Sequence, residues 1–322
     1  MPQKRTIDAF FASPAKQRKV NEREKSTVTQ DESSTCSTHA TYPFPIPGLP
    51  SHISKDLSSL PAVPGRIIND QPDLDLLYFE PYVPTYLAKD LFTFLRADLP
   101  FYRVKYSIKR FGVETAINTP RYTTVFGLDE TSRFSDSEDN IILDAKTGIK
   151  VPTSAYARYA PRPIPKCLDD LRRSTEAATG CSFNFCLVNY YSSGSDSISY
   201  HSDDERFLGN EPAIASFSLG ARRDFLMKHK PVAADKPQAE AKPIKLPLGS
   251  GDMILMKGKT QSNWLHSIPK RSGKNEVGGR INITFRRAMV KGGTDNYYNY
   301  NVGTGPVYKW NEDAREMQIW KS

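Results

Sequence analysis

His201 and Asp203 are spaced so that both could bind one metal ion. They stand two residues apart in a segment of extended character, and residues two apart on a strand project to the same face. His266 offers a third ligand from a later segment. Two histidines and one carboxylate form the ligand set of the non-haem Fe(II) oxygenases, and the same residue types also suit a zinc hydrolase. The residues alone therefore predict a metal site and leave its metal open.

A polar face on the segment Arg280–Arg286 separates these two classes. Strand alternation places Arg280, Asn282, Thr284 and Arg286 on one face and the apolar residues between them on the other. Two buried guanidinium groups are costly unless anions meet them. A dicarboxylic cosubstrate would supply two carboxylates, which arginine binds in bidentate geometry. The pair favours an oxygenase with such a cosubstrate, and pairing with structural acids is the alternative.

Helices precede strands in the part of the chain that carries these residues. Leucines at helical spacing predict a helix that ends before Pro100, and a second helix fits residues 166–179, followed by Gly180. After Gly180 the apolar period changes to two. This order predicts an α+β, mainly β fold, in which a jelly-roll core is braced by helices. The predicted strands are 183–191, 213–219, 224–228, 252–256 and 280–286.

Three motifs occur together in this chain. The first, N-x-Y-x-x-G-x-D-x-x-x-x-H-x-D-D-E-R, begins at Asn189, and the second is S-x-P directly after His266. The third, R-x-N-x-T-F-R, begins at Arg280. In combination they resemble the AlkB family of 2-oxoglutarate- and Fe(II)-dependent dealkylating oxygenases, and most closely its DNA-repair branch. The resemblance covers about residues 75–288.

The resemblance implies a double-stranded β-helix fold and an oxidative reaction. That reaction uses Fe(II), 2-oxoglutarate and O2 to dealkylate DNA bases of the 1-methyladenine and 3-methylcytosine type, and it releases succinate, CO2 and formaldehyde. The same chemistry on RNA is the alternative. The implied iron ligands are His201, Asp203 and His266, with Arg286 as a further residue of the catalytic centre. The residues implied to hold 2-oxoglutarate are Asn189, Tyr191, Arg280, Asn282, Thr284 and Arg286.

A smaller set of residues could meet the substrate base. By resemblance, Asp204 and Glu205 are the acidic pair beside the base, although acids of a solvent-facing loop are the alternative. Phe111 resembles the wedge that fills the gap left by a flipped base, and a core phenylalanine is its alternative. The remaining candidates are Arg121, which could approach base or phosphate, and Tyr156 and Tyr159, either of which could stack on the base.

Residues 1–70 are predicted to be a disordered tail, because the first 40 are rich in Lys, Arg, Ser and Thr and the stretch 41–64 is rich in proline. Within it, Ile7, Phe10 and Phe11 resemble the apolar plug of the motif that docks on the replication sliding clamp. A basic cluster at 16–19 resembles a nuclear import signal. The dioxygenase domain is expected over 71–290 and a C-terminal extension over 291–322.

Charge and composition narrow the classes of partner that this chain could bind. The 322 residues carry 44 Lys and Arg against 36 Asp and Glu, a net charge of +8. A basic chain with no apolar signal segment and no apolar run of about 18 residues predicts a nuclear protein with alkylated DNA, single- or double-stranded, as its partner and no membrane. Four cysteines without a C-x-x-C pair indicate reduced thiols. A monomer is expected, and a non-enzymatic clamp- or DNA-binding jelly roll is the remaining alternative.

Overall fold

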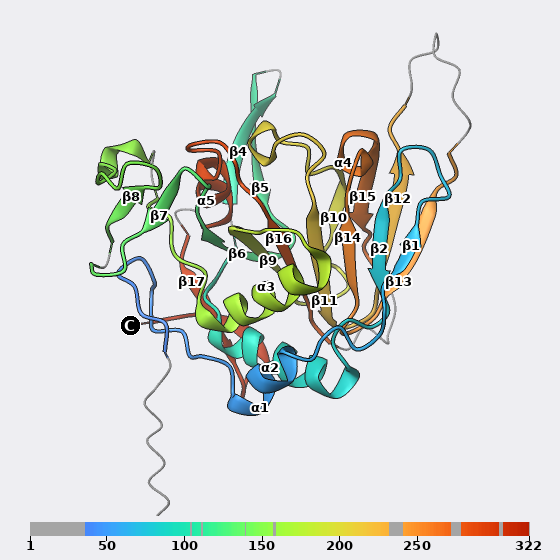
Figure 1. Ribbon diagram of the computed structural model, residues 1–322, viewed down its shortest axis with the longest axis horizontal. Coiled ribbons are helices and arrows are strands. Elements are labelled where there is room, and N and C mark those ends of the chain that lie inside the picture. Colours follow the sequence, from blue (N-terminus) through green and yellow to red (C-terminus); the bar gives the residue numbers. More distant parts are fainter. Residues whose placement is uncertain are drawn as a thin grey trace, which may run out of the picture. The chain divides into compact units, whose positions relative to one another are not determined.

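The computed structural model describes residues 36–103, 105–110, 112–138, 140–156, 159–231, 241–271, 278–302 and 305–321. In these ranges two antiparallel sheets make up the centre of the molecule, and helices cover one of them (Figure 1). This arrangement is the double-stranded β-helix, or jelly roll, and it confirms the predicted fold class.

The larger sheet has ten strands, and every neighbouring pair is antiparallel. Four of its central strands are those predicted from the period-two pattern, over 183–191, 213–219, 252–256 and 280–286, and their bounds agree to within two residues. In spatial order the strands are β1 (Arg66–Ile68), β2 (Leu76–Phe79), β14 (Met253–Met256), β11 (Ile214–Gly220), β16 (Arg280–Arg286), β9 (Phe185–Tyr191), β6 (Tyr122–Gly127), β3 (Phe101–Tyr102), β17 (Val307–Asn311) and β18 (Glu316–Ile319).

The smaller sheet faces one side of the larger one. Side chains from both sheets form one buried cluster, to which the larger sheet contributes Phe185 and Ile254 and the smaller sheet Phe225 and Trp264. Because successive strand residues alternate between faces, every second residue enters this layer. The smaller sheet has the order β10 (Ile198–His201), β15 (Trp264–Ile268), β12 (Arg223–His229) and β13 (Ile244–Leu248).

Two 14-residue helices, α2 (Thr85–Asp98) and α3 (Lys166–Thr179), cover the other face of the larger sheet. Leu91 of α2 and Leu171 of α3 are fully buried in the same cluster as Phe285 of β16. Both helices confirm the predicted ones. None of the helices in the described ranges combines the length and the apolar character that a membrane span requires.

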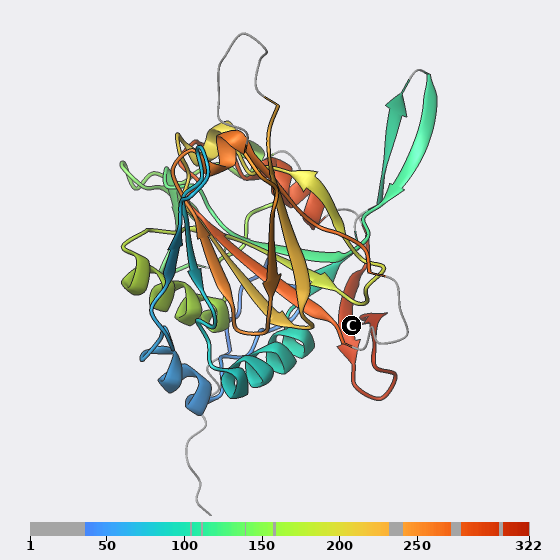
Figure 2. The same cartoon turned by 90° about the vertical axis from the view of Figure 1, so that its right-hand side faces the viewer.

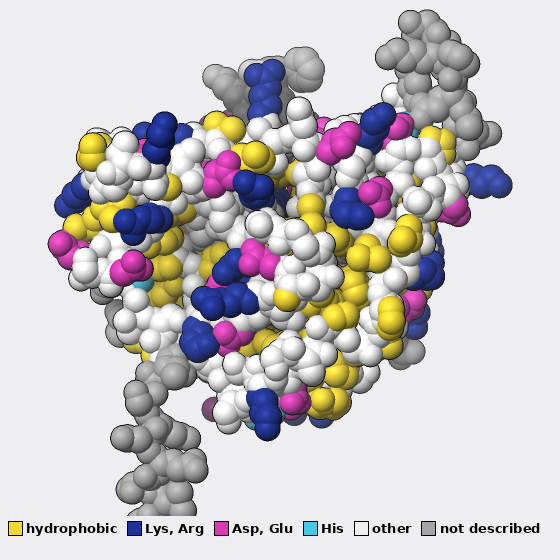
Figure 3. All heavy atoms as spheres, in the orientation of Figure 1, with side chains coloured by type: hydrophobic (Ala, Val, Ile, Leu, Met, Phe, Trp, Pro, Cys, Tyr) yellow, Lys and Arg dark blue, Asp and Glu magenta, His cyan; other side chains and the backbone are white. Residues whose placement is uncertain are grey.

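The outer face of α3 carries paired charges. Asp169 accepts from Arg172 and Arg173, and Lys166 pairs with Asp170 at 2.9 Å. Figure 3 shows the same pattern more widely, since Lys and Arg side chains on this face are interspersed with Asp and Glu side chains. The net positive charge of the chain is therefore not gathered into one patch on this face.

The remaining elements are short. Strands β4 and β5 form a hairpin that projects from the sheets (Figure 2), and β7 and β8 form a second hairpin with its own small apolar cluster. Their bounds are β4 (Lys105–Arg110), β5 (Val113–Asn118), β7 (Ser132–Phe134) and β8 (Ile142–Asp144). The other short elements are η1 (Thr153–Ala155), η2 (Arg206–Leu208), α1 (Ser51–Leu57), α4 (Thr260–Asn263) and α5 (Asp295–Asn301).

The expected disorder of residues 1–70 is wrong for residues 36–70. Ile46, Leu49, Ile53 and Leu57 are buried in the helix-side cluster, and residues 66–68 form the edge strand β1. The prolines do not oppose this structure, because they flank the helix α1 and its interior contains none. The folded part of the chain therefore begins well before the expected boundary, and residues 1–35 lie outside the described ranges.

The C-terminal extension is built into the larger sheet. Strand β17 pairs with β3 through Val307 and Tyr308, and β18 pairs with β17. Helix α5 packs on β6, where the hydroxyl of Tyr298 donates to the carbonyl oxygen of Gly127 at 2.7 Å. The extension thus shares the core of the dioxygenase domain.

Candidate active site

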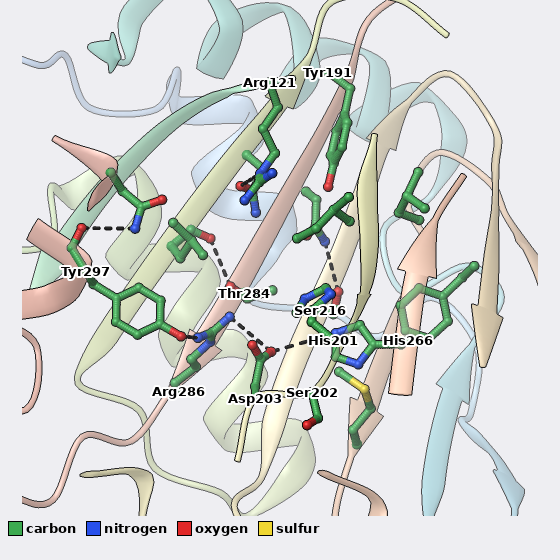
Figure 4. A pocket seen from close by; sticks show the side chains of 18 of the residues that line it. Arg121, Tyr191, His201, Ser202, Asp203, Ser216, His266, Thr284, Arg286 and Tyr297 are labelled. Atoms are coloured by element: carbon green, nitrogen blue, oxygen red, sulfur yellow. Dashed lines mark hydrogen bonds and ion pairs between the residues drawn. The ribbon is translucent and has the colours of Figure 1, made fainter. Parts of the chain in front are cut away.

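A cavity of about 330 Å³ opens between the two sheets and brings together most of the predicted site residues (Figure 4). The larger sheet contributes polar side chains of β9 and β16, and the smaller sheet contributes residues of β10, β12 and β15. The predicted residues on its wall are Arg121, Asn189, Tyr191, His201, Asp203, Glu205, His266, Arg280, Asn282, Thr284 and Arg286.

His201, Asp203 and His266 converge at one side of this cavity. His201 lies opposite His266 in the antiparallel pair of β10 and β15, which brings the two ring centroids to 4.2 Å. Asp203 follows two residues after His201, and the potential ligand atoms of the three residues all lie within 4.8 Å of one another. The ring of His266 stacks on Phe225, which fixes its plane. The three groups can therefore bind one metal ion from one side.

Hydrogen bonds, burial and neighbouring charges prepare these three side chains to act as metal ligands. The Nδ1 atom of His201 lies 2.8 Å from the carbonyl oxygen of Ser199, so an Nδ1–H can donate there and leave Nε2 as the ligand. Burial, with a smaller contribution from His201, lowers the pKa of His266 to about 3, so the ring is neutral at physiological pH. Burial by itself raises the pKa of Asp203, but Arg286, His266, His201 and Arg121 together outweigh that effect and hold the pKa below its ordinary value. The cluster thus offers two imidazoles, that of His266 neutral, and one carboxylate.

The polar face of β16 forms the floor of the cavity. Arg280, Asn282, Thr284 and Arg286 line it, whereas the alternating Ile281, Ile283 and Phe285 enter the helix-side core. Strands β9 and β11 lie on either side, and the register places Arg280 opposite Tyr191 and Asn282 opposite Asn189. The structure therefore confirms that β16 has one polar face and one apolar face, as strand alternation predicts.

Arg280 is a buried cation without a carboxylate partner among the described residues. Its side chain is 1% exposed, and its Nη2 donates to Ser218 Oγ at 2.8 Å. Its Nε and Nη1 atoms have no hydrogen-bond partner in the described ranges. Burial lowers the pKa of Arg280 to about 10, so the group stays charged at neutral pH. Arg280 lies over the ring of Tyr191 at 5.3 Å, and a buried guanidinium with no carboxylate partner among the described residues is suited to bind an anion.

The middle of the floor is held by amide and hydroxyl contacts. Asn282 Nδ2 donates to Ser216 Oγ at 2.9 Å and to the carbonyl oxygen of Phe217 at 2.7 Å. Thr284 donates to the carbonyl oxygen of Leu187 at 3.1 Å. Arg121 Nε donates to Asn189 Oδ1 at 2.9 Å, which holds this guanidinium at the cavity.

Arg286 connects the metal cluster to a residue that the sequence analysis did not select. Its Nη2 donates to Asp203 Oδ2 at 3.1 Å, and its Nη1 donates to the hydroxyl of Tyr297 in helix α5. Tyr297 in turn donates to Glu205 Oε1 at 2.5 Å. The aromatic cluster at 296–300 is visible in the sequence, but nothing in its spacing shows that it reaches the cavity.

Other predicted substrate residues lie elsewhere. Asp204 pairs with Lys230 at 2.6 Å and does not line the cavity. Burial raises the pKa of Asp204, but the bond to Lys230 brings the pKa below its ordinary value. Tyr156 packs on the small cluster of the β7–β8 hairpin and Tyr159 on the cluster between the sheets, and neither lines the cavity.

Two predicted sets of residues fall outside the described ranges. One is Phe111, which falls between β4 and β5 in the sequence, and the other comprises Ile7, Phe10 and Phe11 of the tail.

Residues 77–286 match the model of the 2OG-Fe(II) oxygenase superfamily, so the chain belongs to this superfamily. Within it, the relatives place the chain in the AlkB family. It is 38% identical over 131 residues to DNA oxidative demethylase ALKBH2 of Homo sapiens, covering 41% of this chain and 49% of the relative.

Two further relatives extend the comparison. The chain is 42% identical over 135 residues to alpha-ketoglutarate-dependent dioxygenase alkB homolog 3 of Bos taurus, covering 41% of this chain and 46% of the relative. It is 31% identical over 233 residues to DNA oxidative demethylase ALKBH2 of Arabidopsis thaliana, covering 67% of each. The matched region thus spans about half the length of the first of these curated relatives and two thirds of the plant one.

The cavity fits the groups for which the superfamily is named. Imidazole nitrogens and a carboxylate oxygen are the donors that Fe(II) takes in a facial triad. The unpartnered donors of two buried arginines, Arg280 Nε and Nη1 and Arg286 Nε, fit a ligand that brings carboxylates. The His–Asp–His cluster and the two arginines line the same cavity, so a bound metal ion and a bound dicarboxylate would lie close together.

Proposed function

We propose that this chain is a DNA-repair oxygenase that removes alkyl groups from ring nitrogens of DNA bases, such as 1-methyladenine and 3-methylcytosine. A single observation carries the proposal, which is that a His–Asp–His cluster and two buried arginines share one cavity. The names of the curated relatives, which describe DNA oxidative demethylases, support DNA as the substrate.

In this proposal His201, Asp203 and His266 hold Fe(II). Arg280 and Tyr191 take the far carboxylate of 2-oxoglutarate, and the other carboxylate lies toward Arg286 and Asn282. Asn189 and Thr284 complete the wall between these two ends. Bound Fe(II) and 2-oxoglutarate would supply the oxidising chemistry, which is hydroxylation of the alkyl carbon by O2 with succinate and CO2 as co-products.

The protein's own residues then orient the base. The hydroxymethyl group on the ring nitrogen breaks its C–N bond, formaldehyde leaves, and the ring nitrogen is restored, so no protein nucleophile is needed. The base must leave the stack to reach a cavity between two sheets. Glu205 Oε2, which is buried at this cavity without a partner among the described residues, is the acceptor we assign to the base. Arg121 lines the same cavity and is the residue we assign to the base or to a phosphate.

Formaldehyde release tests this function. The substrates are oligonucleotides with one 1-methyladenine in single-stranded DNA, duplex DNA or RNA of the same sequence. We expect release that requires Fe(II) and 2-oxoglutarate and that is faster on DNA than on the RNA. His201→Ala should abolish it, because two ligands cannot hold the iron. Release from RNA alone would replace DNA with RNA as the substrate.

We also propose that the tail tethers this enzyme to the replication sliding clamp in the nucleus. Ile7, Phe10 and Phe11 are three large apolar residues in a polar stretch, which is the pattern of a segment that folds on binding. The basic cluster at 16–19 supports nuclear import. Phe10→Ala with Phe11→Ala should abolish binding to an immobilised clamp and leave turnover of short oligonucleotides unchanged. Retained clamp binding would refute the tether.

A further inference from the structure

Tyr297 reaches the active site from outside the region that matches the superfamily. The match ends at residue 286, at the end of β16, whereas Tyr297 stands in α5 of the C-terminal extension. Figure 4 shows its ring beside the floor of the cavity, with the hydroxyl directed at Arg286. The extension therefore contributes a side chain to the wall of the cavity.

The ring of Tyr297 is fixed on both sides. It makes edge contacts with Phe185 of β9, at 5.2 Å between centroids, and with Phe207 of η2, at 5.6 Å. These contacts restrict the ring to one position, so the hydroxyl is held in one place as well.

The hydroxyl of Tyr297 joins two charged groups of opposite sign. It accepts from Arg286 Nη1 and donates to Glu205 Oε1, and Arg286 continues through Nη2 to Asp203. Burial raises the pKa of Tyr297, so the phenol keeps its proton and can donate to Glu205. One phenol thus bridges the guanidinium on the metal side to the carboxylate on the substrate side.

Each of the two charged groups still has an unused atom. Arg286 Nε and Glu205 Oε2 are buried and have no partner among the described residues. A bond to Tyr297 at one atom of each group fixes the direction in which the other atom points. Without that bond the carboxylate of Glu205 would turn about its own side-chain torsions, and the guanidinium of Arg286 would be held by Asp203 alone.

We propose that Tyr297 is a positioning residue, which sets Arg286 toward 2-oxoglutarate and Glu205 toward the substrate base and fixes them relative to each other. The inference rests on the proposed function for the identity of both ligands. The C-terminal extension is then a part of the active site, and the chain would bind its cosubstrate poorly without it.

The experiment compares Tyr297→Phe with Tyr298→Phe. The first keeps the ring contacts and loses only the bridging hydroxyl. The second removes a hydroxyl from the next residue of the same helix, where it bonds to the backbone of Gly127 and Arg162 and does not line the cavity. Three quantities are measured: the Kd of 2-oxoglutarate with Mn(II) by calorimetry without nucleic acid, kcat/KM on methylated DNA, and the Tm.

Tyr297→Phe should raise the Kd and lower kcat/KM by about 10- to 100-fold, the usual effect of losing a contact that orients a ligand group. Its Tm should stay near that of the unmodified chain. Tyr298→Phe should lower the Tm and leave the Kd and kcat/KM unchanged. A Kd and kcat/KM within twofold of the unmodified values for Tyr297→Phe would overturn the proposal, as would an equal loss in both variants.

A double-mutant cycle with Glu205→Gln separates positioning from packing. If Tyr297 acts through Glu205, Tyr297→Phe should reduce kcat/KM much less in the Glu205→Gln background than in the unmodified chain. Strict additivity of the two changes would contradict the inference. If no methylated substrate is turned over at all, the proposed function fails. The shift in Kd for 2-oxoglutarate without nucleic acid would still decide the role of Tyr297 toward Arg286.

Discussion

At the scale of single residues, the buried charge of Arg280 explains most about the cavity. Its Nη2 donates to the hydroxyl of Ser218, which carries no charge, and Nε and Nη1 have no hydrogen-bond partner in the described ranges. Burying a cation in this way is costly unless an anion arrives to pair with it. The residue is thus poised for a ligand and contributes little to stability without one.

Arg280→Lys should raise the Kd of 2-oxoglutarate by about tenfold or more, because lysine keeps the charge and loses the planar fork that meets a carboxylate. Calorimetry with Mn(II) measures this directly. Arg162→Lys is the matched control, since Arg162 is also buried but bonds to Tyr102 away from the cavity. An equal rise in both variants would mean that the effect is structural.

A second prediction at the residue scale concerns the reactivity of the four cysteine thiols. Cys167 and Cys186 are fully buried, and burial raises the pKa of both thiols. A thiol reagent at pH 8 should therefore modify neither of them until the protein unfolds, because the reactive thiolate is almost absent. Cys36 is exposed and Cys181 is half-buried, so these two should react in the folded protein. Labelling followed by peptide mass spectrometry identifies the sites.

The sequence predicts the catalytic residues better than the substrate residues, for a physical reason. His201, Asp203 and the face of β16 are placed by strand alternation, which is a local rule. Tyr297 stands in helix α5, 11 residues beyond the end of β16, and no local pattern specifies its contact with the cavity. Tyr156 has the right residue type, but it belongs to the small cluster of the β7–β8 hairpin.

At the scale of elements, the predicted helices and central strands follow their apolar period, and the misses are at elements whose partners are distant. The stretch 228–246 is rich in Pro, Ala and Lys, a composition that predicts an extended exposed loop. Its end is instead part of β13, which contains Pro247 and pairs with β12 as an edge strand, where proline is tolerated. Helix α1 is only seven residues long, and its burial against the core decides its structure more than propensity does.

Ile53→Ala tests whether α1 belongs to the folded domain. Ile53 is 1% exposed within the helix-side core, so the substitution should lower the free energy of unfolding by about 2–5 kcal/mol. Urea titration measures this value. Ser59→Ala, at an exposed position just after the helix, should change it by about 0.5 kcal/mol or less. An unchanged free energy of unfolding in Ile53→Ala would show that this segment is not part of the folded domain.

At the scale of the whole molecule, the active site is an assembly of distant parts. The metal cluster joins β10 and β15, the anion site lies on β16, and Tyr297 comes from the last helix. The two sheets hold these parts at fixed distances, because each strand is locked to its neighbours by an antiparallel ladder. Catalysis in this account requires the orientation of bound groups, which such a scaffold provides.

The central claim is that this chain demethylates DNA oxidatively, and it is tested most directly by measuring all the products of one reaction together. A single-stranded DNA oligonucleotide with one 1-methyladenine is incubated with the full chain, Fe(II), 2-oxoglutarate and O2, and succinate, formaldehyde and oligonucleotide mass are measured together. The account predicts that succinate and formaldehyde form in equal amounts and that the oligonucleotide loses the mass of one methylene group. It also predicts that His201→Ala gives none of these products. An oligonucleotide of unchanged mass, or formaldehyde formed without 2-oxoglutarate, would contradict it.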